Sequence, residues 1–159
     1  MTQPRRISAI SISKRVAYER LETLSAGESA VGYSVRFDHT YPRPYGSILF
    51  CTPGNLLRRI QGGFTGYSHL IIDEVHERDI NTDLLLVIVR DLIRMGTELK
   101  VIIMSATMDD QRFQKYFNKC PILTINGKWN DSGWGQRNEA KRERMKKNNR
   151  RHHLVFGKS

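Results

Sequence analysis

The sequence has no long hydrophobic run and few residues that form covalent or metal cross-links. No stretch approaches the roughly 20 apolar residues that a helix needs to cross a bilayer, and the polar start does not fit a secretory signal. The two cysteines, Cys51 and Cys120, lie far apart without a Cys-x-x-Cys spacing, which predicts reduced thiols. These absences predict a protein of the nucleus, the cytoplasm or both, neither secreted nor embedded in a membrane.

The sequence also lacks a phosphate-binding loop of the Gly-x-x-x-x-Gly-Lys-Ser/Thr type. In nucleotide hydrolases the backbone N–H groups and the lysine of that loop bind the phosphates on which the other catalytic groups act. Gly-Lys-Ser does occur at residues 157–159, but His152 stands where the first glycine should be. We interpret this ending as a coincidence.

The net charge of +10 is concentrated at the C-terminal end. Residues 1–127 carry 16 Lys and Arg against 13 Asp and Glu, whereas residues 128–159 carry 10 against 3. Low apolar periodicity predicts that 128–159 is a disordered basic tail, with a frayed helix near 139–147 as the alternative. Such a tail is either a solvated segment, a nuclear-localisation signal or an RNA-binding patch in which its two tryptophans stack on bases.

Hydrophobic periodicity over residues 1–127 predicts one α/β domain with a mostly parallel sheet and helices on both faces. The strands are predicted at residues 31–37, 47–51, 69–73, 99–104 and 121–125. The helices are predicted from a cap at Ser8 or Ser11 to Gly27, after Thr52, from Asp79 to Met95, and after Asp109. At this length the chain has room for one hydrophobic core of ordinary size.

Two adjacent carboxylates follow the predicted strand at 69–73. Asp73 ends an apolar run, Glu74 comes next, and His76 lies two residues further on. The carboxyl ends of parallel strands are where open α/β sheets bind ligands. Carboxylate oxygens suit Mg²⁺, and an attacking water needs a nearby proton acceptor. The pattern therefore favours a nucleotide-hydrolysing site.

Four segments together resemble the motifs of one enzyme family. Asp-Glu-Val-His-Glu-Arg at 73–78, followed by Ser-Ala-Thr at 105–107, resembles motifs II and III of the DEAH-box RNA helicases of superfamily 2. Thr-Gln-Pro-Arg-Arg at 2–6 resembles motif Ia, and Cys-Thr-x-Gly-x-Leu-Leu-Arg at 51–58 resembles motif Ib. Within the family, the segments at 32–37, 43–48 and 77–83 most resemble the RNA helicase A, or maleless, type.

This resemblance covers roughly residues 2–127 and implies a partial RecA-like (P-loop NTPase) domain. The implied activity is ATP hydrolysis coupled to RNA unwinding, with ATP and Mg²⁺ as cofactors and RNA, or alternatively DNA, as partner. The family's phosphate loop precedes motif Ia and its second RecA-like domain follows the first. We expect both to lie outside this chain.

The resemblance also implies a role for each matched residue in catalysis. Asp73 and Glu74 are the implied Mg²⁺ ligands, largely through water, and Glu74 also polarises the attacking water. His76 is implied to sense the nucleotide. Ser105 and Thr107 are implied to couple hydrolysis to strand separation.

The implied RNA-binding residues are Arg5, Arg6, Thr52 and Arg36. The alternative interpretation of the three arginines is that they are solvated charges on the surface with no contact to phosphate. Thr52 before Pro53 fits an N-cap, a feature that stabilises a helix by about 1 kcal/mol. A cap and a phosphate contact are compatible, because a helix N-terminus is itself an anion site.

Three functional hypotheses remain open from the sequence. A phosphate loop normally fixes the γ-phosphate relative to Glu74, and this sequence has none. Because such positioning supplies most of the catalysis in phosphoryl transfer, we expect negligible ATP hydrolysis by this polypeptide alone. We also expect a missing first strand, an exposed sheet edge and marginal stability. The alternatives to a helicase are a non-catalytic RNA-binding or interfering fragment and an incomplete gene product.

Overall fold

The computed structural model describes residues 1–61, 65–107, 110–117, 120–126 and 151–157. The helices are α1 (Arg6–Glu19), α2 (Pro53–Ile60), the short 3-10 helix η1 (Val75–Glu77), α3 (Ile80–Arg94) and α4 (Asp110–Tyr116). The strands are β1 (Val31–Val35), β2 (Asp38–Thr40), β3 (Ile48–Cys51), β4 (His69–Ile72), β5 (Lys100–Ser105), β6 (Ile122–Asn126) and β7 (Arg151–Gly157). No helix within these ranges is both long and apolar enough to span a bilayer.

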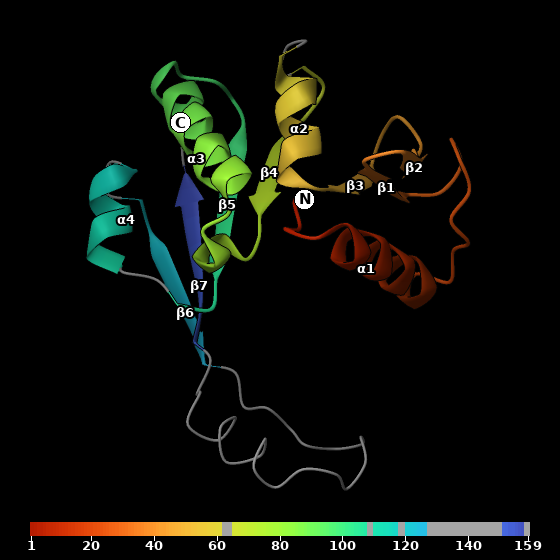
Figure 1. Ribbon diagram of the computed structural model, residues 1–159, viewed down its shortest axis with the longest axis horizontal. Helices are drawn as coiled ribbons and strands as arrows, with labels where there is room; N and C mark the ends of the chain where they lie inside the picture. Colours follow the sequence, from red (N-terminus) through yellow and green to blue (C-terminus); the bar gives the residue numbers. More distant parts are fainter. Residues whose placement is uncertain (62–64, 108–109, 118–119, 127–150, 158–159) are drawn as a thin grey trace, which may run out of the picture.

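The N-terminal residues join two groups of strands into one sheet. The first group has the order β2-β1-β3 and the second the order β4-β5-β7-β6 (Figure 1). Thr2 forms parallel bridges to Cys51 at the end of β3 and to Ile72 at the end of β4. Its amide donates to the carbonyl of Ile71, and the amide of Gln3 donates to the carbonyl of Cys51, both at 2.8 Å. The two groups are therefore continuous through Thr2.

Most strands of this sheet run in one direction. The strands β1, β3, β4 and β5 are parallel, either by direct pairing or through Thr2. Both β5 and β6 are antiparallel to β7 between them, so β6 shares their direction. Among the strands described, β2 and β7 run the opposite way. The α/β prediction is confirmed, and the sheet is mixed.

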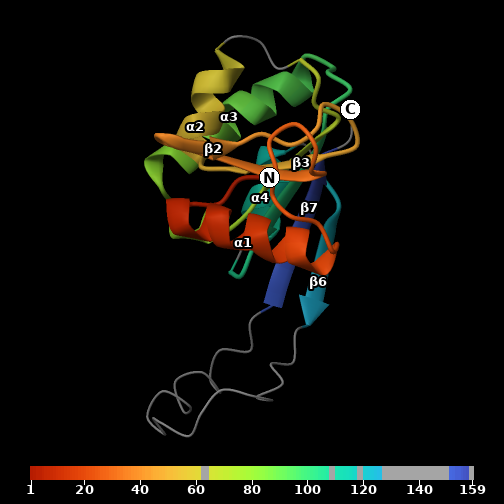
Figure 2. The same ribbon diagram turned by 90° about the vertical axis from the view of Figure 1, so that its right-hand side faces the viewer.

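Each face of the sheet has its own hydrophobic core. Phe50 and Cys51 are consecutive on β3, so their side chains point to opposite faces. Phe50 packs with Val31 and Val35 against α1, whereas Cys51 belongs to the cluster formed with α2 and α3. Figure 2 shows α1 on one side of β1 and β3, with α2 and α3 on the other. The prediction of helices on both faces is confirmed.

The helix α1 approaches its face of the sheet through small residues. Ala9, Ser13 and Ala17 recur every fourth residue and are buried. The hydroxyl of Ser13 donates to the carbonyl of Ile10 at 2.8 Å, which satisfies a buried polar group within the helix. Leu21 has apolar spacing relative to Ala17, but it follows the helix and is 95% exposed. Small side chains, rather than large ones, therefore define the packing face.

The helix α3 begins and ends where its sequence predicts. The carboxylate of Asp79 accepts from the amides of Asn81 and Thr82 at 3.1 and 3.3 Å, and this satisfies donors that have no partner inside the helix. A glycine with φ of +72°, Gly96, follows the helix. The buried face consists of Thr82, Leu85, Leu86 and Val89, whereas the apolar side chains of Ile80 and Leu84 are exposed.

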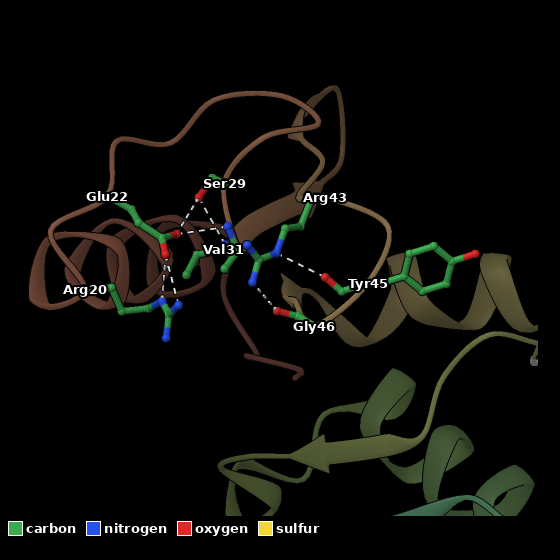
Figure 3. Close-up of polar contacts among 8 residues, drawn as sticks. Arg20, Glu22, Ser29, Val31, Arg43, Tyr45 and Gly46 are labelled. Carbon is green, nitrogen blue, oxygen red and sulfur yellow. Dashed lines mark hydrogen bonds and ion pairs between the residues drawn. The ribbon is translucent and has the colours of Figure 1, made fainter.

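A carboxylate fixes the connection from α1 to β1. One oxygen of Glu22 accepts from the Arg20 guanidinium at 2.9 Å, and the other accepts from the amide of Ala30 at 2.9 Å and from the Ser29 hydroxyl (Figure 3). The Ser29 hydroxyl in turn accepts from the amide of Val31. The backbone contact with Ala30 and the contact with Arg20 lower the pKa of Glu22. The start of β1 is thus held by hydrogen bonds to an ionised side chain.

Three predicted boundaries differ from the structure by more than one residue. The helix predicted to run to Gly27 ends at Glu19, because Leu21 takes a positive φ of +57° that cannot continue the helix. The helix predicted to begin at Ser8 or Ser11 begins at Arg6, because the chain leaves its sheet position at residues 1–3 and turns at once. The strand predicted over 31–37 ends at Val35, because the next two residues turn the chain into β2. The predicted cap Asp109 lies outside the described residues.

The prediction of a disordered tail is wrong for residues 151–157. These residues form β7, which pairs with β5 on one side and β6 on the other. The rest of the tail, including the predicted frayed helix, lies outside the described residues. Local composition did not reveal β7, because its hydrogen-bond partners come from strands far earlier in the chain.

Both cysteines are free and buried. Burial raises the pKa of the Cys51 thiol and of the Cys120 thiol. Each thiol is therefore a poor nucleophile at neutral pH.

Gly32 is expected to be intolerant of any side chain. A Cβ at this position in β1 would lie 2.4 Å from the carbonyl oxygen of Thr40 and 2.4 Å from Cδ of Pro42. We predict that Gly32→Ala lowers the free energy of unfolding by about 1–3 kcal/mol, measured by urea denaturation. Gly54→Ala is the matched control, because the same methyl group at Gly54 meets only ordinary contacts with Asn81. Equal stability of the two variants would contradict the prediction.

Candidate functional site

The predicted site residues gather along one edge of the sheet. The strands β3, β4 and β5 run in the same direction, with Thr2 bridging the first two. Thr52 follows β3, Asp73 follows β4, and β5 ends with Ser105. Because the carboxyl ends of parallel strands share an edge, these segments lie side by side. The backbone therefore places Thr52, Asp73 and Ser105 at one edge of the sheet.

Asp73 is held by two donors. Its Oδ2 accepts from Nε2 of Gln3 at 2.7 Å, and its Oδ1 accepts from the amide of Glu74 at 2.8 Å. Gln3 is buried because it follows the bridging residue Thr2 in the sheet. We did not predict a site role for Gln3 from the sequence. Its position inside the Thr-Gln-Pro-Arg-Arg segment was the available signal.

Glu74 adopts a left-handed backbone conformation with φ of +57°. Such a conformation costs a non-glycine residue about 1–3 kcal/mol, so it persists only where the surroundings impose it. Here the preceding β4 and the following η1 hold it, and its side-chain Oε2 lies 3.2 Å from Nε2 of His76. The carboxylate remains partly exposed. The turn therefore presents a carboxylate at the sheet edge.

His76 connects the segment after β4 with the segment after β5. Its Nδ1 accepts from the amide of Ala106 at 3.3 Å while its Nε2 faces the carboxylate of Glu74. These two contacts together select the tautomer with the proton on Nε2. The next turn is closed by the Ser105 hydroxyl, which donates to the carbonyl of Thr107 at 2.8 Å. His76 is therefore the predicted site residue that connects the Glu74 turn to the segment after β5.

The carboxylates at this edge fit a metal held largely through water. The described ranges contain no group of three or more His, Cys, Asp or Glu side chains able to enclose an ion. Mg²⁺ characteristically keeps several waters and uses only one or two protein carboxylates together with phosphate oxygens. Asp73 and Glu74 are adjacent, and both offer hard oxygen ligands. The donor set therefore suits Mg²⁺ better than a metal that needs a complete protein cage.

The predicted RNA contacts near the helix starts are surface features. Arg5 lies 3.5 Å from Glu77, and both side chains are solvated enough that this ion pair adds little stability. Arg6 is exposed at the first position of α1. Thr52 precedes α2 as predicted, but its side chain makes no capping hydrogen bond. Thr52 thus stands at the predicted N-cap position, where its carbonyl accepts from the amide of Leu56, but the side-chain bond expected of a cap is not formed.

Arg36 lies in an open pocket of about 360 Å³ near the same edge. The structure brings it together with Arg58 and Arg59 of α2 and with the aromatic rings of Phe37 and Tyr41. The guanidinium of Arg36 lies 4.8 Å from the centre of the Phe37 ring, and that of Arg59 lies 4.9 Å from the centre of the Tyr41 ring. Sequence reasoning identified only Arg36 here. The consecutive arginines in a short helix were the missed signal.

The charge of Arg59 is secured by its neighbours. Burial alone disfavours the cation, but the hydrogen bond from its guanidinium to the Tyr67 hydroxyl at 3.3 Å and the phenol groups of Tyr67 and Tyr41 outweigh burial. The net effect raises the pKa of Arg59. The pocket therefore keeps its positive charge across the physiological pH range.

Phe37 occupies the turn between β1 and β2 in an unfavourable conformation. Its φ is +66°, and its side chain is 87% exposed. Asn or Gly is the usual residue at such a position, so an exposed aromatic here is costly for both backbone and solvation. The turn therefore presents an aromatic ring to solvent at the rim of the pocket that contains Arg36.

Comparison with known proteins finds relatives over most of the chain. Human ATP-dependent DNA/RNA helicase DHX36 is 46% identical over 128 residues, which cover 79% of this chain and 13% of that protein. ATP-dependent RNA helicase DHX30 from Gallus gallus is 46% identical over 129 residues, which cover 80% of this chain and 10% of that protein. The chain thus spans 10–13% of the length of these relatives. No protein-family model matches it.

The contact between His76 and Ala106 can be tested through the amide proton. We predict that His76→Leu speeds hydrogen exchange of the Ala106 amide about 2- to 10-fold, because one hydrogen bond of about 0.5–1.5 kcal/mol is lost. Exchange is measured residue by residue by NMR. The matched control is His39→Leu, in the pocket lined by Arg36, Arg58 and Arg59 (the basic pocket), which should leave the exchange rate of the Ala106 amide unchanged. An unchanged rate in His76→Leu would exclude the contact.

Proposed function

We propose that this chain, which belongs to the DEAH-box helicase family, supplies part of the first RecA-like domain of an ATP-dependent RNA helicase. The main support is His76, which contacts both Glu74 and the amide of Ala106 and so joins two family motifs. DHX36 is named as a DNA/RNA helicase, so DNA remains an alternative partner. The relatives confirm the predicted family. The RNA helicase A type, the nuclear or cytoplasmic location and the domain boundary at residue 127 remain predictions.

Asp73 and Glu74 form the proposed nucleotide side of the site. These two carboxylates would hold a Mg²⁺ ion largely through water, and the ion would supply positive charge beside the phosphate oxygens. The bonds from Gln3 and from the Glu74 amide orient the Asp73 carboxylate before any ligand arrives. The Glu74 carboxylate lies at the edge, where it accepts a proton from an attacking water. His76 fixes the direction of that carboxylate through its Nε2.

Ser105 and Thr107 form the proposed coupling segment. They flank Ala106, whose amide donates to His76, so a displacement of the Glu74 turn reaches the end of β5 directly. The hydrogen bond from Ser105 to the Thr107 carbonyl makes this turn a compact unit. Coupling through a shared hydrogen bond requires no large movement of the sheet.

The RNA side is formed by Arg5, Arg6, Thr52 and the pocket around Arg36. Guanidinium groups bind phosphates in two-pronged hydrogen bonds, and exposed aromatic rings stack on unpaired bases. The pocket combines three arginines with Phe37 and Tyr41, as single-strand binding requires. In the family the domain works with a second RecA-like domain, which we propose as its partner.

The same pocket supports a second candidate, nucleic-acid binding without catalysis. Its residues come from β1, the β1–β2 turn, β2 with the residue that follows it, and α2, and none of them belongs to the Asp73–His76 segment. RNA binding by this surface therefore does not require nucleotide. In that case the polypeptide acts as a non-catalytic or interfering RNA-binding fragment.

Phe37 is predicted to trade stability for RNA affinity. Phe37→Gly relieves the positive φ and is expected to raise the free energy of unfolding by about 1 kcal/mol. The same change removes a stacking platform, so affinity for a fluorescein-labelled single-stranded RNA should fall about 5- to 100-fold in an anisotropy titration.

Leu21→Gly is the matched control for Phe37→Gly. Leu21 also has positive φ, +57°, and is equally solvent-facing, but it lies after α1 and away from the pocket. It should gain similar stability and keep wild-type RNA affinity. If Phe37→Gly binds RNA as tightly as Leu21→Gly does, the pocket is not the RNA site.

The 159-residue polypeptide assayed alone is predicted not to hydrolyse ATP. Without a phosphate loop the γ-phosphate is not fixed relative to Glu74, whatever the orientation of the carboxylate. Mg²⁺-dependent phosphate release, with and without single-stranded RNA, should equal that of Glu74→Gln. Circular dichroism of both chains establishes that they are folded. RNA-stimulated turnover that Glu74→Gln abolishes would contradict the prediction.

A further inference from the structure

The second half of the sheet contains a gap one strand wide between β5 and β6, and β7 fills it. One edge of β7 pairs with β5 from Val101 to Ser105, and the other pairs with β6 from Ile122 to Asn126. Within the described residues β5 and β6 do not pair with each other. Both backbone edges of β7 are therefore used, while each neighbour depends on β7 for pairing on the side that faces it.

The chain order makes β7 a late addition to this gap. The helix α4 and its flanking residues connect β5 to β6, and both strands run in the same direction. This strand–helix–strand unit is complete before β7 begins at Arg151. Residues 127–150 lie between β6 and β7 in sequence. Removing β7 from the gap therefore breaks no connection between the elements that form it.

We propose that the gap between β5 and β6 is a binding site for an extended peptide segment, occupied by residues 151–157 of the same chain. The ligand is a β-strand, recognised by main-chain hydrogen bonds on both of its edges. An empty gap leaves two rows of backbone N–H and C=O groups without partners, next to the buried core residues Val101 and Ile103. Filling it with a strand satisfies both rows.

Occupancy of this gap also supports the end of β5. The last pair between β5 and β7 joins Ser105 to His153. Ala106, the next residue, donates its amide to His76. A filled gap therefore holds the backbone that makes the contact between β5 and the Glu74 turn. The proposal concerns backbone pairing and does not depend on the proposed helicase function.

The first test removes one main-chain donor from β7. Val155 pairs with Ile103 on one side and with Ile122 on the other. Val155→Pro cannot complete this ladder, whereas Val155→Thr keeps the N–H and serves as the matched control. Amide exchange in residues 101–105 and 122–126 should accelerate about 10-fold or more in the proline variant only. Wild-type exchange in Val155→Pro would overturn the proposal.

A second test works in the full chain without disturbing the ladder. Met104 and Leu154 are register partners, so Met104→Cys with Leu154→Cys should form a disulfide under mild oxidation. Met104→Cys with Val155→Cys is one residue out of register and should not cross-link. Mass spectrometry identifies the linked peptides, and a non-reducing gel gives the number of chains. Absence of the in-register link, or a link joining two molecules, would overturn the proposal.

Discussion

The backbone pairing of Thr2 between β3 and β4 is the constraint on which the rest of the structure depends. It joins two groups of strands into one sheet, and the two hydrophobic cores pack on the faces of that sheet. It also places Gln3 beside Asp73 and starts α1 immediately afterwards. Thr2 is fully buried, and its hydroxyl is the one buried side-chain polar atom in the described residues without a partner. The backbone bonds of this segment offset that cost.

Backbone strain in this protein is concentrated where ligands are proposed to bind. Glu74, Arg78 and Phe37 have positive φ, and all three lie in the turns that form the carboxylate site or the basic pocket. Leu21 shares the conformation but belongs to a connection after α1. Strain alone therefore does not identify a site. At Glu74 and Phe37 it coincides with a partly or largely exposed side chain that we propose contacts a ligand.

The second half of the sheet solves a pairing problem with a distant segment. Sequence reasoning expected a missing first strand and an exposed sheet edge. The gap beside β5 is instead filled by β7, which arrives from the far end of the chain. Other apolar residues on β5, such as Ile102 and Met104, remain only partly buried, because α1 covers β1 and β3 rather than this half. In this half of the sheet, β5 is paired by backbone hydrogen bonds on both edges, but its side chains are only partly buried on one face.

Local sequence determined the elements whose signals are short-range. The alternation of strands and helices, the Asp79 cap, the end of α3 before Gly96 and the carboxylates after β4 all followed from residues close together in the chain. Tertiary structure alone decided the role of Thr2, the small-residue face of α1, the meeting of Arg36 with Arg58 and Arg59, and the strand β7. The physical reason is that periodicity and capping act over one or two turns. Strand neighbours and pockets depend on which distant segments meet.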